Sequence, residues 1–205
     1  MQRQSMERAA LAADVRPLFL QRRPEGERVY PHLQAALEAT PEGEMLLLQF
    51  TSEQNSDPSF MDASFIELAD KLLQGQFGDR GLALQGLNES LIYNIECTLS
   101  RKRELARREG RDFKVVFLAF TLEPPPGRLP VDGWSILGTL EPSLMDVLCL
   151  LTQRQSLSAA DVASAFDLEL NTASMRLKRL YERHLIRREY QALPHGREFV
   201  YVFWR

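Results

Sequence analysis

Cysteine is scarce in this chain, with only Cys97 and Cys149 among 205 residues. So few cysteines exclude a disulfide-rich scaffold and are typical of reduced, intracellular proteins, although a single disulfide stays open. Histidine is also rare, and no cysteine and histidine spacing resembles a zinc site. The sequence therefore predicts no metal site.

Long apolar runs are absent as well. No run approaches the roughly 18 residues that a membrane-spanning helix requires. The segment from Met1 to Glu7 is polar and lacks the apolar stretch of a secretory signal peptide. We therefore expect a cytoplasmic protein with no membrane partner.

The common motifs of catalysis are missing too. His32, His184 and His195 lie on different segments, without an aspartate or cysteine partner at a recognisable spacing. The segment from Gly75 to Gly81 lacks the lysine and hydroxyl of a phosphate-binding loop, and no nucleophile elbow occurs. The sequence predicts a protein that is not an enzyme and holds no cofactor.

What is present is the composition of a folded protein, with 44% hydrophobic and 26% charged residues. The length fits one large domain or two small ones. The net charge of −3 disfavours indiscriminate nucleic-acid binding, but it leaves room for a local basic face.

Short apolar runs alternate with amphipathic helical patterns between residues 44 and 120. The patterns predict strands over 44–50, 81–87 and 113–120, and between them helices over 62–73 and 88–108. This order indicates an α/β domain over 44–120 with a mixed sheet of at least partly parallel strands.

Residues 1–43 precede this domain and either belong to it or form a separate arm. Their patterns predict, in chain order, a short helix or loose tail over 1–14, an edge strand over 15–21, a turn over 22–28 and a helix over 29–39.

Three consecutive prolines between Glu123 and Gly127 mark the end of the α/β pattern, because they can continue neither a helix nor a central strand. We interpret 121–139 as a proline-rich linker or domain edge. Residues 140–205 then show three helical patterns, followed by two β-rich runs around Pro194-His195-Gly196. The expected ranges are helices over 141–153, 158–166 and 171–184, and strands over 187–193 and 198–204.

Three helices and a β-hairpin, together with the stretch from Leu170 to Glu189, resemble the MarR-like winged helix-turn-helix domains of bacterial regulators. In that family the helix that begins near Asn171 enters the major groove, and the hairpin is the wing. The resemblance implies a transcriptional regulator that binds double-stranded DNA as a homodimer. The DNA-binding candidates carried over by position are Asn171, Thr172, Ser174, Met175, Lys178, Arg179, Arg183, Arg187, Arg188, His195 and Arg197. The alternative is an ordinary solvated face with Asn171 as a helix cap.

The segments Leu46–Phe50, Phe60–Leu68 and Gly81–Glu96 resemble STAS-like domains, which are related to anti-sigma factor antagonists. The resemblance implies a domain that senses a partner or mediates dimerisation, with a kinase-like ATPase or another protein as the partner. It also aligns Ser64 with a serine that is phosphorylated at the start of a helix. The alternative reading is that Asp62 caps this helix and Ser64 is only a first-turn residue.

Two further alternatives stay open. The run from Arg101 to Arg111 holds six basic and two acidic residues, which suits either a helix C-terminus or a second contact to a phosphate backbone. The chain as a whole, with its acidic pI of about 5.7, also suits a protein-interaction module of a signalling switch, in which the winged helix docks a protein instead of DNA.

Overall fold

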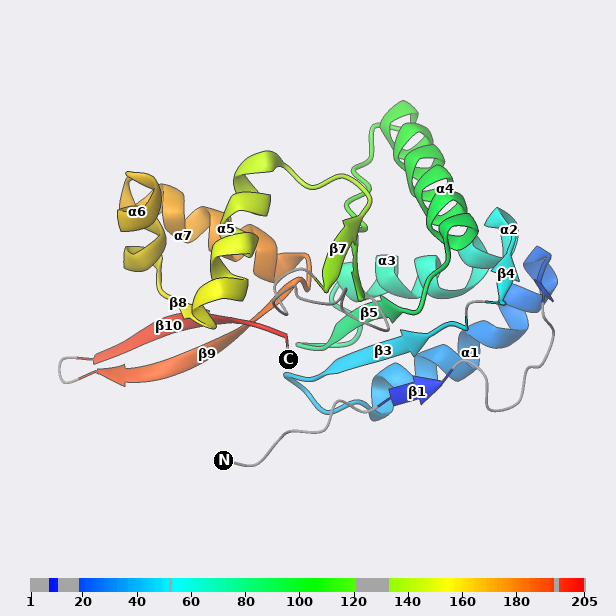
Figure 1. Cartoon of the computed structure of the whole chain (residues 1–205), viewed down its shortest axis with the longest axis horizontal. Coiled ribbons are helices and arrows are strands. Elements are labelled where there is room, and N and C mark those ends of the chain that lie inside the picture. Colours follow the sequence, from blue (N-terminus) through cyan, green and yellow to red (C-terminus); the bar gives the residue numbers. More distant parts are fainter. Residues whose placement is uncertain (1–7, 11–18, 52, 121–132, 194–195, 205) are drawn as a thin grey trace. The chain divides into compact units, whose positions relative to one another are not determined.

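The structure is a computed structural model that describes residues 8–10, 19–51, 53–120, 133–193 and 196–204 (Figure 1). Residues 8–10, 19, 192–193 and 196–198 are described by their backbone only. The chain divides into two compact units, Met1–Thr139 and Leu140–Arg205. Within the described ranges, no helix is both long and apolar enough to cross a membrane.

The first unit is built on a mixed five-stranded sheet, so the predicted mixed α/β fold is confirmed. The strand order is β1-β3-β5-β6-β7, and every neighbouring pair is parallel except β6 and β7, which are antiparallel. The bounds are β1 Arg8–Ala10, β3 Met45–Gln49, β5 Gly81–Gln85, β6 Phe117–Phe120 and β7 Trp134–Leu137. A separate parallel pair joins β2 (Phe19–Leu20) to β4 (Asn55–Ser56).

The two edge strands of the sheet correct the sequence interpretation. β1 lies in the segment 1–14, for which we predicted a short helix or tail. β7 lies in the predicted linker 121–139, whose residues 121–132 are outside the described part of the chain. Of the edge strand predicted over 15–21, residues 15–18 lie outside the described part of the chain, and Phe19–Leu20 form β2.

Helices α1 (Arg23–Ala39), α2 (Pro58–Met61), α3 (Glu67–Leu73) and α4 (Glu89–Arg108) pack with the sheet around one apolar core. Between α2 and α3 the helix continues as the π-helical segment η1 (Asp62–Ile66). The Phe65 ring lies 5.8 Å from both Phe50 and Phe117, edge-on to each. This aromatic cluster joins η1 to the sheet.

Helix α1 begins at Arg23, so the turn predicted over 22–28 is wrong. Pro24 is tolerated there because the first turn of a helix has free backbone N–H groups in any case. Gly26 lies against the next helix, where an added Cβ would be 2.6 Å from the Phe60 carbonyl oxygen. The glycine therefore serves close packing between α1 and α2.

The helix predicted over 62–73 begins earlier, at Pro58, and its cap is Asp57 rather than Asp62. The Asp57 carboxylate accepts hydrogen bonds from the backbone N–H of Phe60 at 2.8 Å and from that of Arg22 at 2.7 Å. Burial alone would raise the Asp57 pKa, but these hydrogen bonds outweigh it and hold the pKa below its ordinary value.

The second unit contains α5 (Pro142–Arg154), α6 (Ala159–Phe166) and α7 (Leu170–Glu182), close to the three predicted helices. A three-stranded antiparallel sheet of order β8-β10-β9 completes it. Its hairpin, β9 (Ile186–Leu193) and β10 (Gly196–Phe203), forms a long ribbon (Figure 1). The short β8 (Ser156–Leu157) was not predicted.

Candidate nucleic-acid interface

Helix α7 has one buried face and one exposed face, and the exposed face carries most of the predicted contacts. Ala173, Leu177 and Leu180 recur at helical spacing and are completely buried against the rest of the second unit. Helices α5 and α6 and strand β9 all pack against α7. The six predicted residues on the other side are all exposed: Asn171, Thr172, Ser174, Met175, Lys178 and Arg179.

The polar side chains at the start of α7 are not used to build the helix. The helix begins at Leu170 with Glu169 at the cap position, so the interpretation of Asn171 as a cap is wrong. Among the described residues, neither Asn171 nor Thr172 nor Ser174 has a side-chain hydrogen-bond partner. Their donors and acceptors are therefore available to a ligand.

The basic side chains of the α7 face are weakly held. The Lys178 ammonium lies 3.6 Å from the Glu182 carboxylate, in a pair whose side chains are more than half exposed. Exposed pairs of this kind contribute little stability, so a phosphate can displace the glutamate at small cost. Arg179 is exposed and forms no ion pair within the described part of the chain, although its charge helps to lower the pKa of Glu141.

Arg183, which we predicted to contact DNA, is committed to an ion pair within the second unit. Its guanidinium makes two ion-pair contacts of 2.8 Å with the Glu141 carboxylate, and its side chain is only 11% exposed. Burial alone would raise the Glu141 pKa, but a hydrogen bond from its own backbone N–H and the pair with Arg183 together lower it. The pair connects the end of α7 to the residue that precedes α5.

The hairpin places its predicted residues in different environments. The Arg187 guanidinium contacts Glu189 at 2.8 Å. The Arg188 guanidinium stacks on the rings of Tyr181 and Phe199, at 4.5 and 4.1 Å from the ring centres. The predictions for His195 and for the side chain of Arg197 lie outside the described residues.

Tyr190 is an exposed aromatic residue that the sequence analysis missed. It is paired across the hairpin with Phe199, their ring centres are 4.4 Å apart, and 69% of its surface is exposed. Strand alternation places Arg188 and Tyr190 on the same face of β9, which is the signal that could have identified this residue. The hairpin therefore presents an aromatic surface next to a guanidinium.

Ser64, the predicted phosphoacceptor, is placed where modification would require local unfolding. It is completely buried within η1, not at a helix start, and its hydroxyl donates a hydrogen bond of 2.7 Å to the Phe60 carbonyl oxygen. This helical segment begins six residues earlier, at Pro58, so both the predicted helix start and the first-turn position of Ser64 are wrong.

No family model, curated protein or solved structure matches this chain. Within the described residues, no group of three or more histidine, cysteine, aspartate or glutamate side chains could hold a metal ion. Function is therefore inferred from the placement and chemistry of individual residues.

Proposed function

We propose that this protein is a DNA-binding transcriptional regulator. In this proposal the unit Leu140–Arg205 is a winged helix-turn-helix domain that binds double-stranded DNA, with α7 in the major groove. The unit Met1–Thr139 is a STAS-like domain that senses a partner or pairs two copies of the chain. The observation that carries the proposal is the exposed face of α7, where uncommitted polar groups and weakly held cations lie together.

The dimensions and chemistry of α7 suit the major groove. Its 13 residues span about 20 Å, and the groove is about 12 Å wide and admits one helix. An asparagine side chain can bind adenine through two hydrogen bonds, and Asn171 is exposed in the first turn of α7. Lys178 and Arg179, about two turns further along, are suited to phosphate oxygens.

Capping hydrogen bonds fix the start of α6, the helix that precedes α7 in the chain. Helix α6 begins with a reciprocal cap, in which the Ser158 hydroxyl accepts from the Asp161 N–H and the Asp161 carboxylate accepts from the Ser158 N–H. Asp167 then ends α6 in a left-handed conformation, with φ of 51°. The chain thereby turns into α7 within three residues.

A protein-docking role is the second candidate, and exposed apolar side chains favour it. Leu170 is 56% exposed and Met175 48% exposed on α7, and Tyr190 is 69% exposed on the hairpin. Aromatic residues and methionine are enriched at the cores of protein interfaces. In this alternative the second unit of a signalling switch binds another protein through the same surface.

Salt-dependent DNA binding distinguishes the two candidates. We expect the full chain to bind genomic DNA fragments with an affinity that falls steeply from low to high salt. A Lys178→Ala/Arg179→Ala variant should bind more weakly, and its log–log salt slope should be smaller by about 0.9 for each lost phosphate contact. Arg154→Gln, which alters an exposed cation at the end of α5, serves as the matched control.

Absence of binding at low salt would contradict the proposal, as would equal losses in the Arg154 variant and the α7 variant. The first result would favour the protein-docking alternative. Its test is Leu170→Ser, at an exposed apolar residue outside the predicted DNA contacts, which should leave DNA binding unchanged if the primary proposal is correct.

A further inference from the structure

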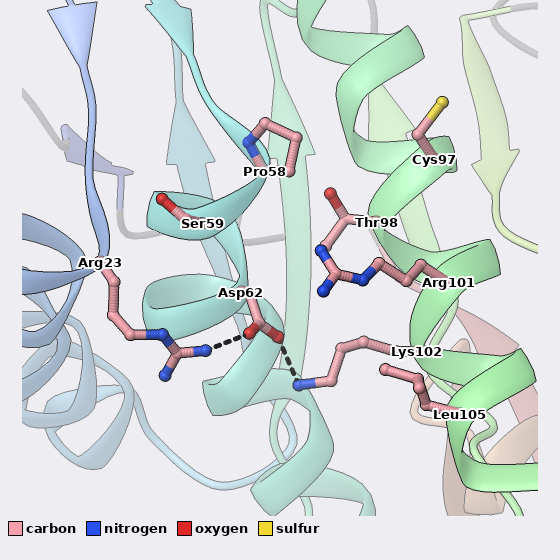
Figure 2. Close-up of a pocket in the computed structure, with 9 residues that line it drawn as sticks. All are labelled: Arg23, Pro58, Ser59, Asp62, Cys97, Thr98, Arg101, Lys102 and Leu105. Carbon is pink, nitrogen blue, oxygen red and sulfur yellow. Dashed lines mark hydrogen bonds and ion pairs between the residues drawn. The ribbon is translucent and has the colours of Figure 1, made fainter.

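A pocket of about 460 Å³ lies in the first unit, between the start of α1, the start of α2 and the middle of α4 (Figure 2). Its volume falls within the range of about 300–1,000 Å³ that is usual for small-molecule sites. The lining residues are Arg23, Pro58, Ser59, Asp62, Cys97, Thr98, Arg101, Lys102 and Leu105.

The pocket carries three cationic side chains and one carboxylate. Asp62 lies between Arg23 and Lys102 and forms an ion pair with each, that with the Lys102 ammonium at 2.6 Å (Figure 2). Asp62 and Lys102 are largely buried, with side-chain exposures of 24% and 23%. The carboxylate therefore fixes two cations from separate helices at the edge of one cavity, and both retain further N–H donors.

Arg101 is the third cation, and it is not neutralised. Among the residues that the structure describes, it has no ion-pair partner, although acidic side chains lie along the same helix. Figure 2 shows its side chain extending from α4 toward α2, across the pocket. The neighbouring cations differ, because Arg107 and Arg108 pair with Glu104, and Arg111 pairs with Glu109.

The remainder of the lining is mostly apolar. Pro58 and Leu105 contribute hydrocarbon surface, and the Thr98 hydroxyl is already committed to the Asn94 carbonyl oxygen at 2.7 Å. The Ser59 hydroxyl likewise donates to Asp57 at 2.7 Å. Arg23 also pairs with Glu27 at 3.8 Å, and Lys102 with Glu67 at 3.9 Å. An occupant of this pocket therefore meets one guanidinium without an ion pair among the described residues, that of Arg101, on one side and hydrocarbon on the other.

We propose that this pocket binds a small molecule that carries a phosphate group, with Arg101 as its principal contact. Guanidinium groups bind phosphate through paired, charge-assisted hydrogen bonds, and Arg101 is the pocket cation whose donors are free of carboxylates. Arg23 and Lys102, held in place by Asp62, complete the cationic wall. The apolar side accepts the organic part of the ligand.

The proposal adds a ligand to the regulator, and its test does not require DNA. Phenyl phosphate is a suitable probe because it joins a phosphate to a small apolar ring, and orthophosphate and phenol separate the two contributions. We would titrate each into the full chain by calorimetry at constant ionic strength. We expect saturable binding of phenyl phosphate, weaker binding of orthophosphate, and no binding of phenol.

Two variants on α4 make the test specific. Arg101→Gln removes the proposed contact, and it should weaken phenyl phosphate binding about tenfold or more, as expected for a lost charge-assisted hydrogen bond. Arg107→Gln removes a cation from the same helix outside the pocket, and its affinity should equal that of the unaltered chain. Circular dichroism checks that both variants keep their helix content.

Two results would overturn the proposal. The first is no saturable binding of phenyl phosphate, and the second is an equal loss in the Arg101 and Arg107 variants, which would show general charge attraction. If the first result came with a separately measured loss of DNA affinity in Arg101→Gln, Arg101 would instead be a contact to a nucleic-acid backbone. None of these results bears on the α7 variants, so failure here and failure of the proposed function are separable.

Discussion

Replacement of Arg183 by methionine removes the guanidinium while keeping most of the hydrocarbon stem, and so isolates the ion pair with Glu141. Exposed pairs contribute about 0–1 kcal/mol, and breaking a buried pair costs about 3–5 kcal/mol. Here the arginine is 11% exposed and the glutamate 49% exposed, so water can solvate the carboxylate that remains. After this discount for solvent, we expect Arg183→Met to lower the free energy of unfolding of the second unit by about 1–2 kcal/mol.

The pH dependence of this loss has a definite sign. The Glu141 pKa is lowered in the folded state, so the pair stabilises the fold above the pKa of an unfolded glutamate, about 4.3. The contribution is lost as the pH falls through the lower, folded pKa. The difference in the free energy of unfolding between the unaltered chain and Arg183→Met should therefore be largest at pH 7 and decrease in acid.

Urea unfolding, followed by the fluorescence of the buried Trp204 in a Trp134→Phe background, measures this difference in the second unit. The matched control is Arg154→Met, because Arg154 is exposed. If Arg183→Met changes the free energy of unfolding by less than about 0.5 kcal/mol at pH 7, which is the usual range for surface substitutions, the reasoning is refuted. A difference that stays constant as the pH falls would also refute it.

The remaining predictions concern packing and capping. Gly26→Ala should destabilise the first unit by about 1–3 kcal/mol, because the new Cβ meets the Phe60 carbonyl oxygen. This cost should exceed the gain from the better helix propensity of alanine. A variant that is more stable than the unaltered chain in urea unfolding would contradict this prediction. Ser158→Ala should cost about 1 kcal/mol in the same assay, with Ser156→Ala as the control, and an unchanged midpoint would count against the cap. Hydrogen bonds from the Ser158 backbone N–H and hydroxyl lower the Asp161 pKa. An NMR titration of Ser158→Ala should therefore show a higher Asp161 pKa than in the unaltered chain. An unchanged pKa would exclude the hydroxyl as a cause.

The central strands and long helices were predictable because their signals are local. β3 and β5 are short apolar runs between turn residues, and α4 has Asn88 at its start, where the side chain accepts from the Leu91 N–H at 2.9 Å. The edge strands β1 and β7 were not predictable in this way. Their sequences are short and ordinary, and they become strands because a neighbour offers unpaired backbone groups.

The helix that begins at Pro58 shows how a correct signal was overlooked. Asp57 followed by Pro58 is a strong start signal, with an acceptor at the cap position and proline in the first turn. The apolar spacing alone nevertheless predicts a helix that begins only at residue 62. The π-helical segment that follows has no sequence signature, and Ser64 departs there from helical geometry, with φ of −119° and ψ of −106°.

The candidate interface was predictable where it depends on helical periodicity, and not where it depends on distant partners. The spacing of Ala173, Leu177 and Leu180 assigns one face of α7 to the core and leaves the other exposed. Arg183 lies one residue past that helix, but its partner Glu141 is 42 residues away in the chain. No pattern within α7 distinguishes Arg183 from Arg179, and only the fold separates a structural arginine from an available one.

The net charge of −3 is a poor guide to the function of this chain, because the fold decides which cations are paired with carboxylates and which are not. Exposed charges more than about 8–10 Å apart are largely screened at physiological ionic strength, so a ligand responds to the local balance of charge. Along α4 the cations Arg107 and Arg108 are matched by Glu104 on the same helix. In the described structure Arg179 and Arg101 form no ion pair with a carboxylate. Arg179 lies near other polar and cationic side chains of α7, and Arg101 lies near Arg23 and Lys102 in the pocket. An acidic chain can therefore present two separate phosphate-binding surfaces, one proposed for DNA and one for a small molecule.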